Sequence, residues 1–580
     1  MIGWPGSAAP DPSRHGGRLP PSGLSCRGSI AVGGRRRDAP PVGAEPLWYD
    51  AREHGLAGDG LTNDQPALAA LVDRAGAACA ADGLRRVIHC PPGAYAIHDA
   101  TTVWRSGVSL IGAGPGPTRF VLANPGNRAE PVALTRFTTL ADDAGRENHL
   151  ADVTFAAFEI DGSGVVLDHY DVLAKGLGLQ YVLRGHFRDL YVHDTGATGF
   201  GCDFLQDTVV EGVLTVNCGR LDPGEEMGGA GIGIGIGGWG ITERTTISAC
   251  TSVGNGTNGI FVELQREYWP PPRGIRILGC HVEDNRYGIS DWGADGMLVS
   301  GCTMLGNHVA GYDVSAQGTS GIGGRGGLVT GCVVDWNVRD GFAIGNTPGP
   351  YTIRGNQISN NGHHGYRQHN LARGEQEPAR GIVLESNEIW GNALDGVHVD
   401  GAVAGAAIVG NRMRDNGRQS APAAAGGGDT VDYTATTVVD TAARWTPDAH
   451  RGKVLRVGER TAVVSANTET ELVLAPWRPG ARTAWQGPAP GAGEPYALPA
   501  APPVRAGLTL AAAVDASTVR GNRAWDDQDR RTQTHGLWIT PAGSCTEGRV
   551  QDNDLLGNAV AGARLDTAPA GGWWERNLGI

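Results

Sequence analysis

The stretch SACTSVGN (248–255) recurs three more times along the chain, as LGCHVEDN (278–285), SGCTMLGN (300–307) and TGCVVDWN (330–337). Each copy places a cysteine five residues before an asparagine. The spacing then continues with asparagine in place of cysteine, in the pairs Asn356/Asn361, Asn387/Asn392, Asn411/Asn416, Asn553/Asn558 and the variant Asn522/Asp527. Within the continuous runs, successive copies lie about 22 to 31 residues apart, a length typical of units that must stack on their neighbours to bury a hydrophobic face.

A glycine opens a second short apolar segment in most units, as in GIFVE (259–263), GYDVS (311–315) and GVHVD (396–400). When each coil of a chain returns to the same positions, like residues stack on like residues, and an asparagine can bond the backbone of the next coil. The repeat therefore predicts an all-β fold, a single-stranded right-handed parallel β-helix solenoid. Its repeated cysteines are expected to form an internal column of free thiols with Asn356, and no disulfides. That column comprises Cys250, Cys280, Cys302 and Cys332.

The composition fits a solenoid and argues against two classes of partner. The 580 residues include 91 glycines and 34 prolines, and only 6% are aromatic, which is typical of a turn-rich chain. A net charge of −13 argues against a nucleic-acid partner. No apolar run approaches the length of a membrane span, so we expect no membrane partner.

The N-terminal segment, residues 1–45, is predicted to be disordered. It is rich in Gly, Pro, Ser and Arg, and it shows no hydrophobic periodicity. It also lacks the apolar core of a secretory signal. Secreted and cytoplasmic locations both stay open at this point, as does the oligomeric state.

The segment from Trp48 reads WYDAREHGLAGDGLTNDQPALAAL and leads to PPGAY at 91–95. It resembles the N-terminal unit of the pectate-lyase-like β-helix superfamily, which places a strand, a GDG turn, a capping helix and a PPGxY strand before the coils. Residues 67–81 have the apolar spacing of an amphipathic helix that could cover the open end of a solenoid. Residues 46–417 are thus expected to form a β-helix with an N-terminal capping helix. The matching residues are Asp50, Gly58, Asp59, Gly60, Thr62, Asp64, Pro91, Pro92, Gly93 and Tyr95.

The repeat stops after Asn416 and resumes near Asn522, which leaves room for an insertion of about 80 residues. Residues 418–505 contain short alternating apolar runs and turn residues, so they are predicted to form a small β module with linkers. Residues 506–580 are expected to supply the C-terminal coils. Because the insertion adds no position to the repeat, we expect the solenoid to fold without it. Its role is either passive or part of a binding face.

Strand alternation places the second and fourth residues after each opening glycine on the outer face of the solenoid. This face would carry carboxylates, imidazoles, arginine and tryptophan, a mixture suited to a polysaccharide or oligosaccharide. Carboxylates bond sugar hydroxyls or transfer protons, and tryptophan rings stack on sugar faces. The candidate substrate-binding residues are Trp292, Asp313, Arg367, His369, His398 and Asp400.

The segment GFGCDFLQD (199–207), within residues 150–265, resembles the catalytic module of mannuronan C5-epimerases. The resemblance implies a catalytic role for Asp203 and a carboxylate-neutralising role for Lys175. However, the family's tyrosine and histidine positions hold Phe200 and Leu205. Neither residue can transfer a proton. The chain therefore lacks most of the side chains that epimerase or lyase chemistry by that mechanism needs. The family's remaining catalytic Asp and His fall in GIGIGIGGWG (231–240) and near Thr257.

Asp203 and Glu263 form the other catalytic hypothesis, a pair of carboxylates for glycoside hydrolysis. With one coil between them they would lie about 9 to 10 Å apart, near the limit for an inverting pair. No cofactor and no metal site are predicted. Calcium stays open for the acidic loop of Asp222, Glu225 and Glu226. His363 and His364 are interpreted as surface residues at a turn.

These observations predict a carbohydrate-active enzyme that acts on a polysaccharide along a lateral groove. Glycoside hydrolysis and uronate lyase or epimerase chemistry both stay open, with Asp203, Glu263 and Lys175 as the catalytic candidates. The alternatives are a noncatalytic polysaccharide-binding or tailspike-like protein, and a biosynthetic enzyme that uses the same scaffold on a smaller substrate.

Overall fold

The computed structural model describes residues 45–580, apart from 127–129, 138–143, 168, 220–227, 267, 316–323, 346, 348, 370–377, 476–482 and 486. Two sequence-based predictions lie outside these described residues. One is the disorder of the N-terminal segment up to residue 44, and the other is the acidic loop of Asp222, Glu225 and Glu226.

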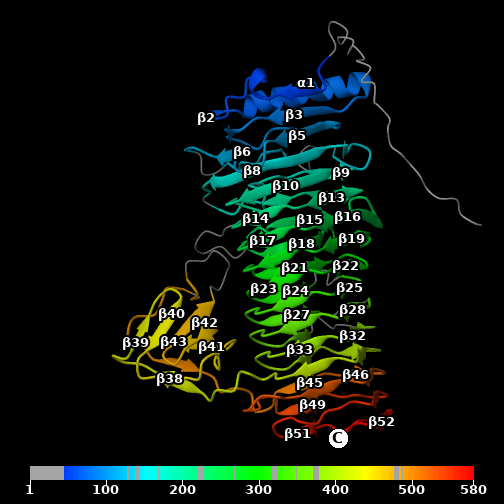
Figure 1. Ribbon diagram of the computed structural model, residues 1–580, viewed down its shortest axis with the longest axis vertical. Coiled ribbons are helices and arrows are strands. Elements are labelled where there is room, and N and C mark those ends of the chain that lie inside the picture. The colour runs from blue at the N-terminus through cyan, green and yellow to red at the C-terminus, as the bar shows by residue number, and fades with distance from the viewer. Residues whose placement is uncertain are drawn as a thin grey trace, which may run out of the picture. The chain divides into compact units, whose positions relative to one another are not determined.

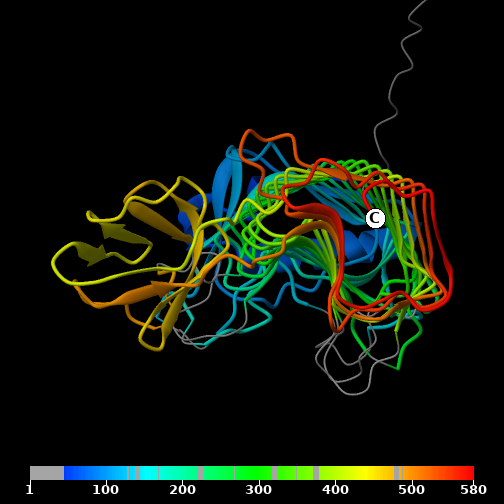
Figure 2. The same cartoon turned by 90° about the horizontal axis from the view of Figure 1, so that it is seen from below.

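The described chain winds into a right-handed parallel β-helix, as predicted (Figures 1 and 2). A typical coil contributes three strands, such as β16 (Thr242–Ser248), β17 (Thr251–Val253) and β18 (Asn258–Leu264). The first two belong to a 28-stranded sheet, called the outer sheet, which begins with β1 (Trp48–Asp50) and ends with β52 (Trp573–Glu575). Equivalent strands of successive coils pair in parallel, so every coil presents its residues at the same positions.

The third strand of each coil lies in an 11-stranded sheet, called the front sheet. The residues that follow the opening glycines point into the core, as strand alternation predicts, and each is at most 2% exposed: Cys202, Ile260, Ile289, Tyr312, Phe342, Tyr366, Val397 and Leu537. The strands are β11 (Phe200–Gly201), β15 (Ile232–Ile236), β18, β21 (Tyr287–Trp292), β24 (Ala310–Val314), β27 (Asp340–Ile344), β30 (Tyr366–Gln368), β34 (Val397–Val399), β45 (Ala506–Leu510), β49 (His535–Ile539) and β51 (Ala561–Leu565).

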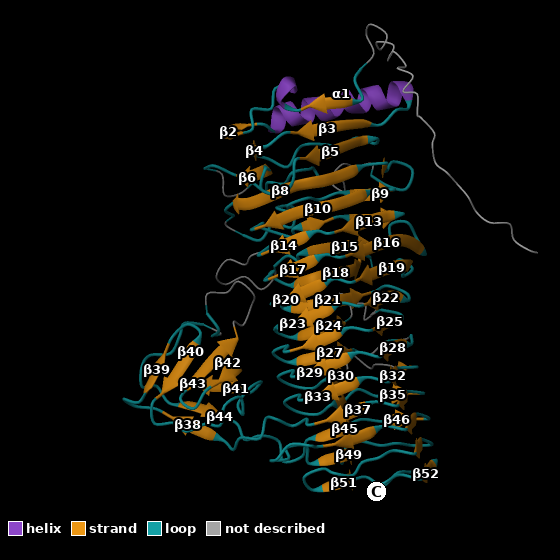
Figure 3. Ribbon diagram, in the orientation of Figure 1, coloured by secondary structure: helices purple, strands orange, loops and turns teal. Residues whose placement is uncertain are grey.

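A single α-helix among the described residues, α1 (Gln65–Asp82), closes the N-terminal end of the solenoid (Figure 3). Its buried face includes Leu68, Leu71 and Val72, and it packs against β3 (Arg86–Cys90) and β5 (Val108–Gly112). The predicted capping helix is therefore confirmed. No helix in the described part of the chain is long and apolar enough to cross a membrane.

Two ladders of stacked side chains run through the corners of the coils. The backbone N–H and the side-chain Nδ2 of Asn285 both donate to Oδ1 of Asn307, at 3.1 and 3.2 Å, and Asn307 repeats both bonds to Asn337 at 3.0 Å. In the other ladder, the N–H of Cys332 donates to Oδ1 of Asn356 at 2.9 Å. The four predicted column cysteines are buried and free, which confirms the internal thiol column.

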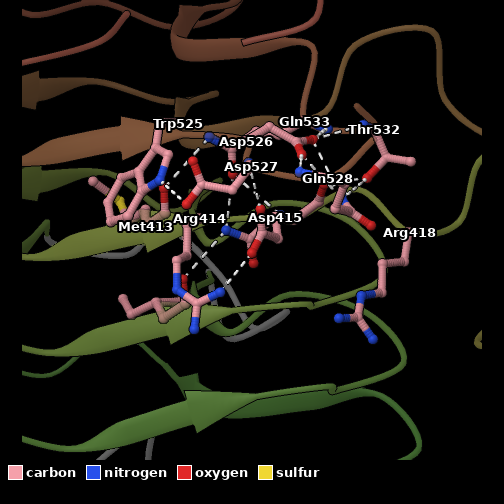
Figure 4. Close-up of polar contacts among 12 residues, drawn as sticks. Met413, Arg414, Asp415, Arg418, Trp525, Asp526, Asp527, Gln528, Thr532 and Gln533 are labelled. Carbon is pink, nitrogen blue, oxygen red and sulfur yellow. Dashed lines mark hydrogen bonds and ion pairs between the residues drawn. The ribbon is translucent and has the colours of Figure 1, made fainter. Parts of the chain in front are cut away.

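After the insertion the ladder continues through Gln533 and not through Asp527, so the predicted pair Asn522/Asp527 is wrong. Nδ2 of Asn416 donates to Oε1 of Gln533 at 2.9 Å, and Nε2 of Gln533 donates to Asn558 at 2.8 Å. Figure 4 shows Gln533 with the neighbouring Asp526 and Thr532. An amide can accept and donate in turn, whereas an ionised carboxylate only accepts. Residues 526–532 form an extra turn in which Asp526 accepts the N–H of Gln533 at 2.7 Å, and this delivers the amide to the ladder.

Replacing Asn307 with leucine is expected to lower the free energy of unfolding by about 2–5 kcal/mol, because the substitution leaves buried donors of Asn285 without an acceptor. The measurement is chemical denaturation followed by circular dichroism. Asn307→Asp is the matched variant: it keeps the acceptor, loses the donor and adds a buried charge, so it should also destabilise. An Asn307→Leu protein as stable as the wild type would show that the ladder contributes no net stability.

The insertion forms a separate antiparallel sheet beside the solenoid, as predicted (Figures 1 and 3). It has its own core, in which Val438, Leu455, Val464, Leu472 and Trp485 are at most 2% exposed. The coils on either side of the insertion pair directly, because β34 pairs in parallel with β45. The strands of this module are β38 (Ala424–Gly426), β39 (Val431–Tyr433), β40 (Thr437–Asp440), β41 (Val454–Val457), β42 (Arg460–Asn467), β43 (Glu471–Ala475) and β44 (Tyr496–Leu498).

Candidate functional site

The outer face of the front sheet brings the predicted substrate-binding side chains into register. Asp313 pairs with Ala343, Ala343 with Arg367, and Arg367 with His398, so these positions form one column across four coils. Trp292, His369 and Asp400 each lie two residues further along their coils than the corresponding column position. The predicted substrate-binding residues therefore share the outer face of the front sheet, although their side chains differ in exposure.

Asp203 and Lys175 are buried, which corrects the expectation of an open outer face at this end of the sheet. Each is 6% exposed. Oδ1 of Asp203 accepts the N–H of Gly235 at 2.8 Å and Oδ2 accepts Gln180 Nε2 at 3.2 Å, while Nζ of Lys175 donates to Gly201 O at 3.2 Å. The strand register is right. The exposure is wrong because Gln180 and the backbone of Gly235 bond Asp203, and the ring of Phe137 lies against Lys175.

Described residues between β6 (Thr118–Ala123) and β7 (Leu150–Ala151), which leave out 127–129 and 138–143, contact the neighbouring coils. Thr135 Oγ1 donates to Gly178 O at 2.8 Å, and Arg146 Nε donates to Gly238 O at 2.8 Å. The ring of Phe137 lies 3.8 Å from Lys175 Nζ and also lines a cavity of about 580 Å³. That cavity is large enough for a sugar unit, and its wall includes His98, Asp99, Asn124, Glu130 and Arg136.

The positions that resemble the epimerase site contain no proton-transferring pair. Phe200 and Leu205 are both fully buried in the core. Glu263 is partly exposed and pairs in register with Gly235, so the backbone of one coil separates it from Asp203, as the sequence predicts. Asp203 is buried and held by hydrogen bonds to Gln180 and Gly235, which leaves Glu263 as the more accessible carboxylate.

Asp313 and Trp292 interact with each other. Trp292 Nε1 donates to Asp313 Oδ2 at 3.0 Å and Ser315 Oγ donates to Oδ1 at 2.9 Å. Asp313 is 3% exposed, and this burial raises its pKa. Asp313, predicted to bind substrate, is thus buried, and neighbouring side chains bond both of its carboxylate oxygens.

Two histidine–aspartate pairs lie further along the front sheet. Nδ1 of His363 is 2.7 Å from Oδ1 of Asp340, and Nδ1 of His398 is 2.7 Å from Oδ2 of Asp395. An ionised carboxylate only accepts, so Nδ1 of each ring carries a proton and Nε2 is the nitrogen left to exchange one. The imidazoles are 23% and 17% exposed while both carboxylates are buried, so the rings can meet a substrate.

His364 separates the two pairs. Its ring stacks on His398 with centroids 4.1 Å apart and meets the edge of His363 at 4.3 Å. Nδ1 of His364 accepts the backbone N–H of Asp395 at 3.2 Å, which places the remaining proton on Nε2. Burial holds the pKa of His364 well below its usual value, so the ring is neutral. The interpretation of His364 as a surface residue at a turn is wrong, since it is 5% exposed.

Neighbouring charges also shift the pKa values of His398 and Asp340 in this region. Although burial lowers the pKa of His398, its hydrogen bond to Asp395 raises the pKa above the usual value. Burial likewise opposes ionisation of Asp340, but the charge and hydrogen bond of His363 lower its pKa overall. Arg367 donates to Asp400 Oδ2 at 2.7 Å. We call Asp340, His363, His364, Arg367, Asp395, His398 and Asp400 the histidine cluster.

Three groups of potential metal ligands occur in the described residues, each with ligand atoms within 4.8 Å: Asp340/His363/His364, His364/Asp395/His398 and Glu159/Asp161/His193. Several of these ligand atoms already have hydrogen-bond partners. His364 Nδ1 is occupied by a backbone N–H, and both nitrogens of His193 face carboxylates, Asp194 at 2.8 Å and Glu159 at 3.3 Å. The groups are therefore arranged as hydrogen-bonded pairs suited to holding protons.

Sequence reasoning missed Asp340 and Asp395, and it assigned His364 to the surface. The signal is the residue immediately before each opening glycine, which is Asp340, then His364, then Asp395 in three successive coils. Asp340 begins β27, as its pairing with Ala310 shows, and His364 and Asp395 lie two residues before β30 and β34. Aligning this one position between successive coils would have predicted a column of a carboxylate, an imidazole and a second carboxylate.

The family model for the right-handed beta helix region matches residues 224–373. The protein carries a right-handed β-helix. Among curated proteins, mannuronan C5-epimerase AlgE3 of Azotobacter vinelandii is 27% identical over 198 residues, which cover 30% of this chain and 10% of that protein. Alginate lyase 7 of the same organism is 27% identical over 206 residues, 30% of this chain and 23% of that protein.

The β-helix protein is thus distantly similar to mannuronan C5-epimerases and to an alginate lyase, as the sequence resemblance predicted for the epimerases. The chain spans about a tenth to a quarter of the length of these two relatives. Among solved structures, the A-module of mannuronan C-5 epimerase AlgE6 from Azotobacter vinelandii aligns with a TM-score of 0.36 and 13% identity, covering 91% of this chain and 98% of that chain.

Proposed function

We propose that this protein is a carbohydrate-active enzyme that removes a proton from a uronate ring of an acidic polysaccharide lying on the front sheet. The observation that carries the proposal is the histidine cluster, with two Asp-bound imidazoles and one arginine on a single face. Each imidazole is oriented by a buried carboxylate, an arrangement suited to general acid–base catalysis. The distant similarity to alginate-processing enzymes supports the substrate class.

The residues have separate roles in this chemistry. Nε2 of His363 accepts the proton at C5, and Arg367 stabilises the negative charge that develops on the uronate carboxylate. His398, whose pKa is raised, holds a proton to donate. If that proton returns to C5 from the other face, the product is the epimer. If it goes to the departing glycosidic oxygen, the bond breaks by elimination and leaves an unsaturated uronate.

A panel of polysaccharides tests the proposal directly. The protein is incubated with polymannuronate, polyguluronate, pectate and a neutral glucan, and three products are followed in parallel. Ultraviolet absorbance reports elimination, deuterium uptake at C5 in D₂O reports epimerisation, and new reducing ends without either signal report hydrolysis. We expect elimination or C5 exchange on a uronate polymer and no reaction with the glucan.

The second candidate is a noncatalytic polysaccharide-binding protein, which is favoured by the apolar Phe200 and Leu205 at the epimerase-like positions. Binding of a uronate polymer without C5 exchange, elimination or cleavage would support this candidate and contradict the enzymatic one. New reducing ends without elimination or C5 exchange would instead support Asp203 and Glu263 as a hydrolytic pair.

A further inference from the structure

The inserted module meets the solenoid at a turn beside the histidine cluster. Arg451, which is 8% exposed, donates to the backbone carbonyl of Asn360, and its Nη2 donates to Trp336 O at 2.9 Å. The guanidinium also lies 4.2 Å from the ring centroid of Trp336. A charge-assisted hydrogen bond of this kind is stronger than a neutral one, and cation–π contact adds to it.

The backbones at this contact fit closely. A Cβ atom on Gly452 would collide with Gly362 O, and a Cβ atom on Gly362 would lie 3.4 Å from Gly452 Cα as well as striking Val338 O. Two glycines therefore face each other where neither could carry a side chain. A close approach that requires glycine on both sides indicates a built interface and not a chance contact of a surface module.

The linker that leads into the module holds the same turn. Arg418 Nη1 donates to the side-chain Oδ1 of Asn360 at 3.2 Å, and Gln419 Nε2 donates to Arg451 O at 3.1 Å. Lys453 Nζ donates to Ala421 O at 2.9 Å, which ties the linker to the module. The turn at Asn360 is thus held from the linker and from the module together.

This turn leads directly into the imidazoles of the cluster. Asn361 belongs to the internal ladder and is fully buried, and His363 and His364 follow it after Gly362. The N–H of His363 donates to Arg339 O at 3.0 Å, and its ring is bound to Asp340. The ladder fixes one side of the turn and the module fixes the other, so the backbone that carries His363 has little freedom.

We propose that the inserted module is a positioning element of the histidine cluster, with Arg451 as the residue that fixes the turn 360–362 and through it the ring of His363. The module is then not a passive insertion. The catalytic consequence rests on the proposed function, whereas the positioning of the ring does not. Arg451 lies behind the turn and touches no member of the cluster in the contacts of the described residues.

The test compares Arg451→Met with Arg451→Lys and with Arg456→Met. Arg456 is an exposed residue of β41 in the same module and serves as the matched control. Imidazole ¹H–¹⁵N spectra of the full chain, assigned with a His363→Gln variant, report the ring nitrogen chemical shifts and the tautomer of His363 without substrate. We expect Arg451→Met to change these chemical shifts and to populate the second tautomer, because the Asp340 hydrogen bond that selects the Nδ1–H form is no longer held in place.

Arg451→Lys keeps the cation but not the forked geometry, so it should restore the His363 spectrum only in part. On a uronate polymer that the protein converts, Arg451→Met should lower kcat about ten- to a hundredfold with little change in KM, since the substrate-binding surface is intact. Circular dichroism and thermal unfolding check that each variant is folded. Arg456→Met should match the wild type in every measurement.

An unchanged His363 spectrum and tautomer in folded Arg451→Met would overturn the positioning role. A changed spectrum with no conversion of any uronate polymer would leave the positioning role standing and count against the proposed enzyme. A fall in kcat with an unchanged His363 spectrum would also overturn the proposal, because the effect would then not pass through His363.

Discussion

Replacing His398 with glutamine is expected to lower kcat on a uronate polymer by about a hundredfold or more, because the variant lacks the proton that the general acid donates. Glutamine can still donate a hydrogen bond to Asp395, so the protein should stay folded. Since Asp395 raises the pKa of His398, the wild-type rate should fall as the pH rises through that pKa. The variant should lose this descending limb. The measurement is the pH dependence of kcat for both proteins.

His363→Gln is expected to lower kcat to a similar degree, since His363 is the base that accepts the C5 proton. The matched control is His281→Gln on the outer sheet, where His281 Nε2 also lies 2.9 Å from a carboxylate, that of Glu283. This control should keep full activity. If His398→Gln and His363→Gln stay active while Asp203→Asn does not, the chemistry belongs to the covered site near Lys175 and our assignment is wrong.

Replacing Glu243 with glutamine is expected to stabilise the protein at high pH by as much as about 5 kcal/mol. Glu243 is fully buried; its Oε1 accepts the N–H groups of Gly237 and Trp239, and its Oε2 has no hydrogen-bond partner among the described residues. This burial raises its pKa from 4.5 to about 8. A glutamine carbonyl can take over both hydrogen bonds and never ionises.

The direction of this change in stability with pH follows from proton binding. Between pH 4.5 and about 8 the folded state holds a proton that the unfolded chain releases, so rising pH removes about 1.4 kcal/mol of stability per unit. Wild type and Glu243→Gln should therefore be about equally stable at pH 4.5 and diverge up to pH 8. Denaturant unfolding across this range measures the difference, with the exposed Glu283→Gln as control. Parallel stability curves for wild type and Glu243→Gln would contradict a buried neutral acid.

The fold could be predicted from local spacing because a solenoid repeats the same local environment. The residue after each opening glycine, such as Ile260 or Phe342, meets its own equivalent in the next coil, so one unit predicts the others. The prediction failed at Asp527, where a seven-residue turn intervenes and Gln533 supplies the ladder amide. A strict five-residue count cannot detect a turn that returns to the same position.

The candidate site was predicted less well, since exposure depends on segments that the repeat does not contain. Alternation correctly placed Asp203 and Asp313 on the outer side of the strands, but Gln180 and Gly235 bond the former and Trp292 bonds the latter. Arg367 and His398 were found because they occupy strand positions, and Asp400 because it directly follows β34. Asp340 and Asp395 were missed, and His364 was assigned to the surface, because all three precede the glycine that marked the register.

The sequence by itself determined the coil, the ladders, the capping helix and the presence of an inserted module, because each follows from contacts between residues at equivalent or adjacent positions. Only the tertiary structure decided which outward side chains are covered, which imidazoles face buried carboxylates, and that Arg451 meets Asn360 across 91 residues of chain. Burial and pKa depend on every segment packed around a group, and such neighbours have no fixed spacing in the sequence.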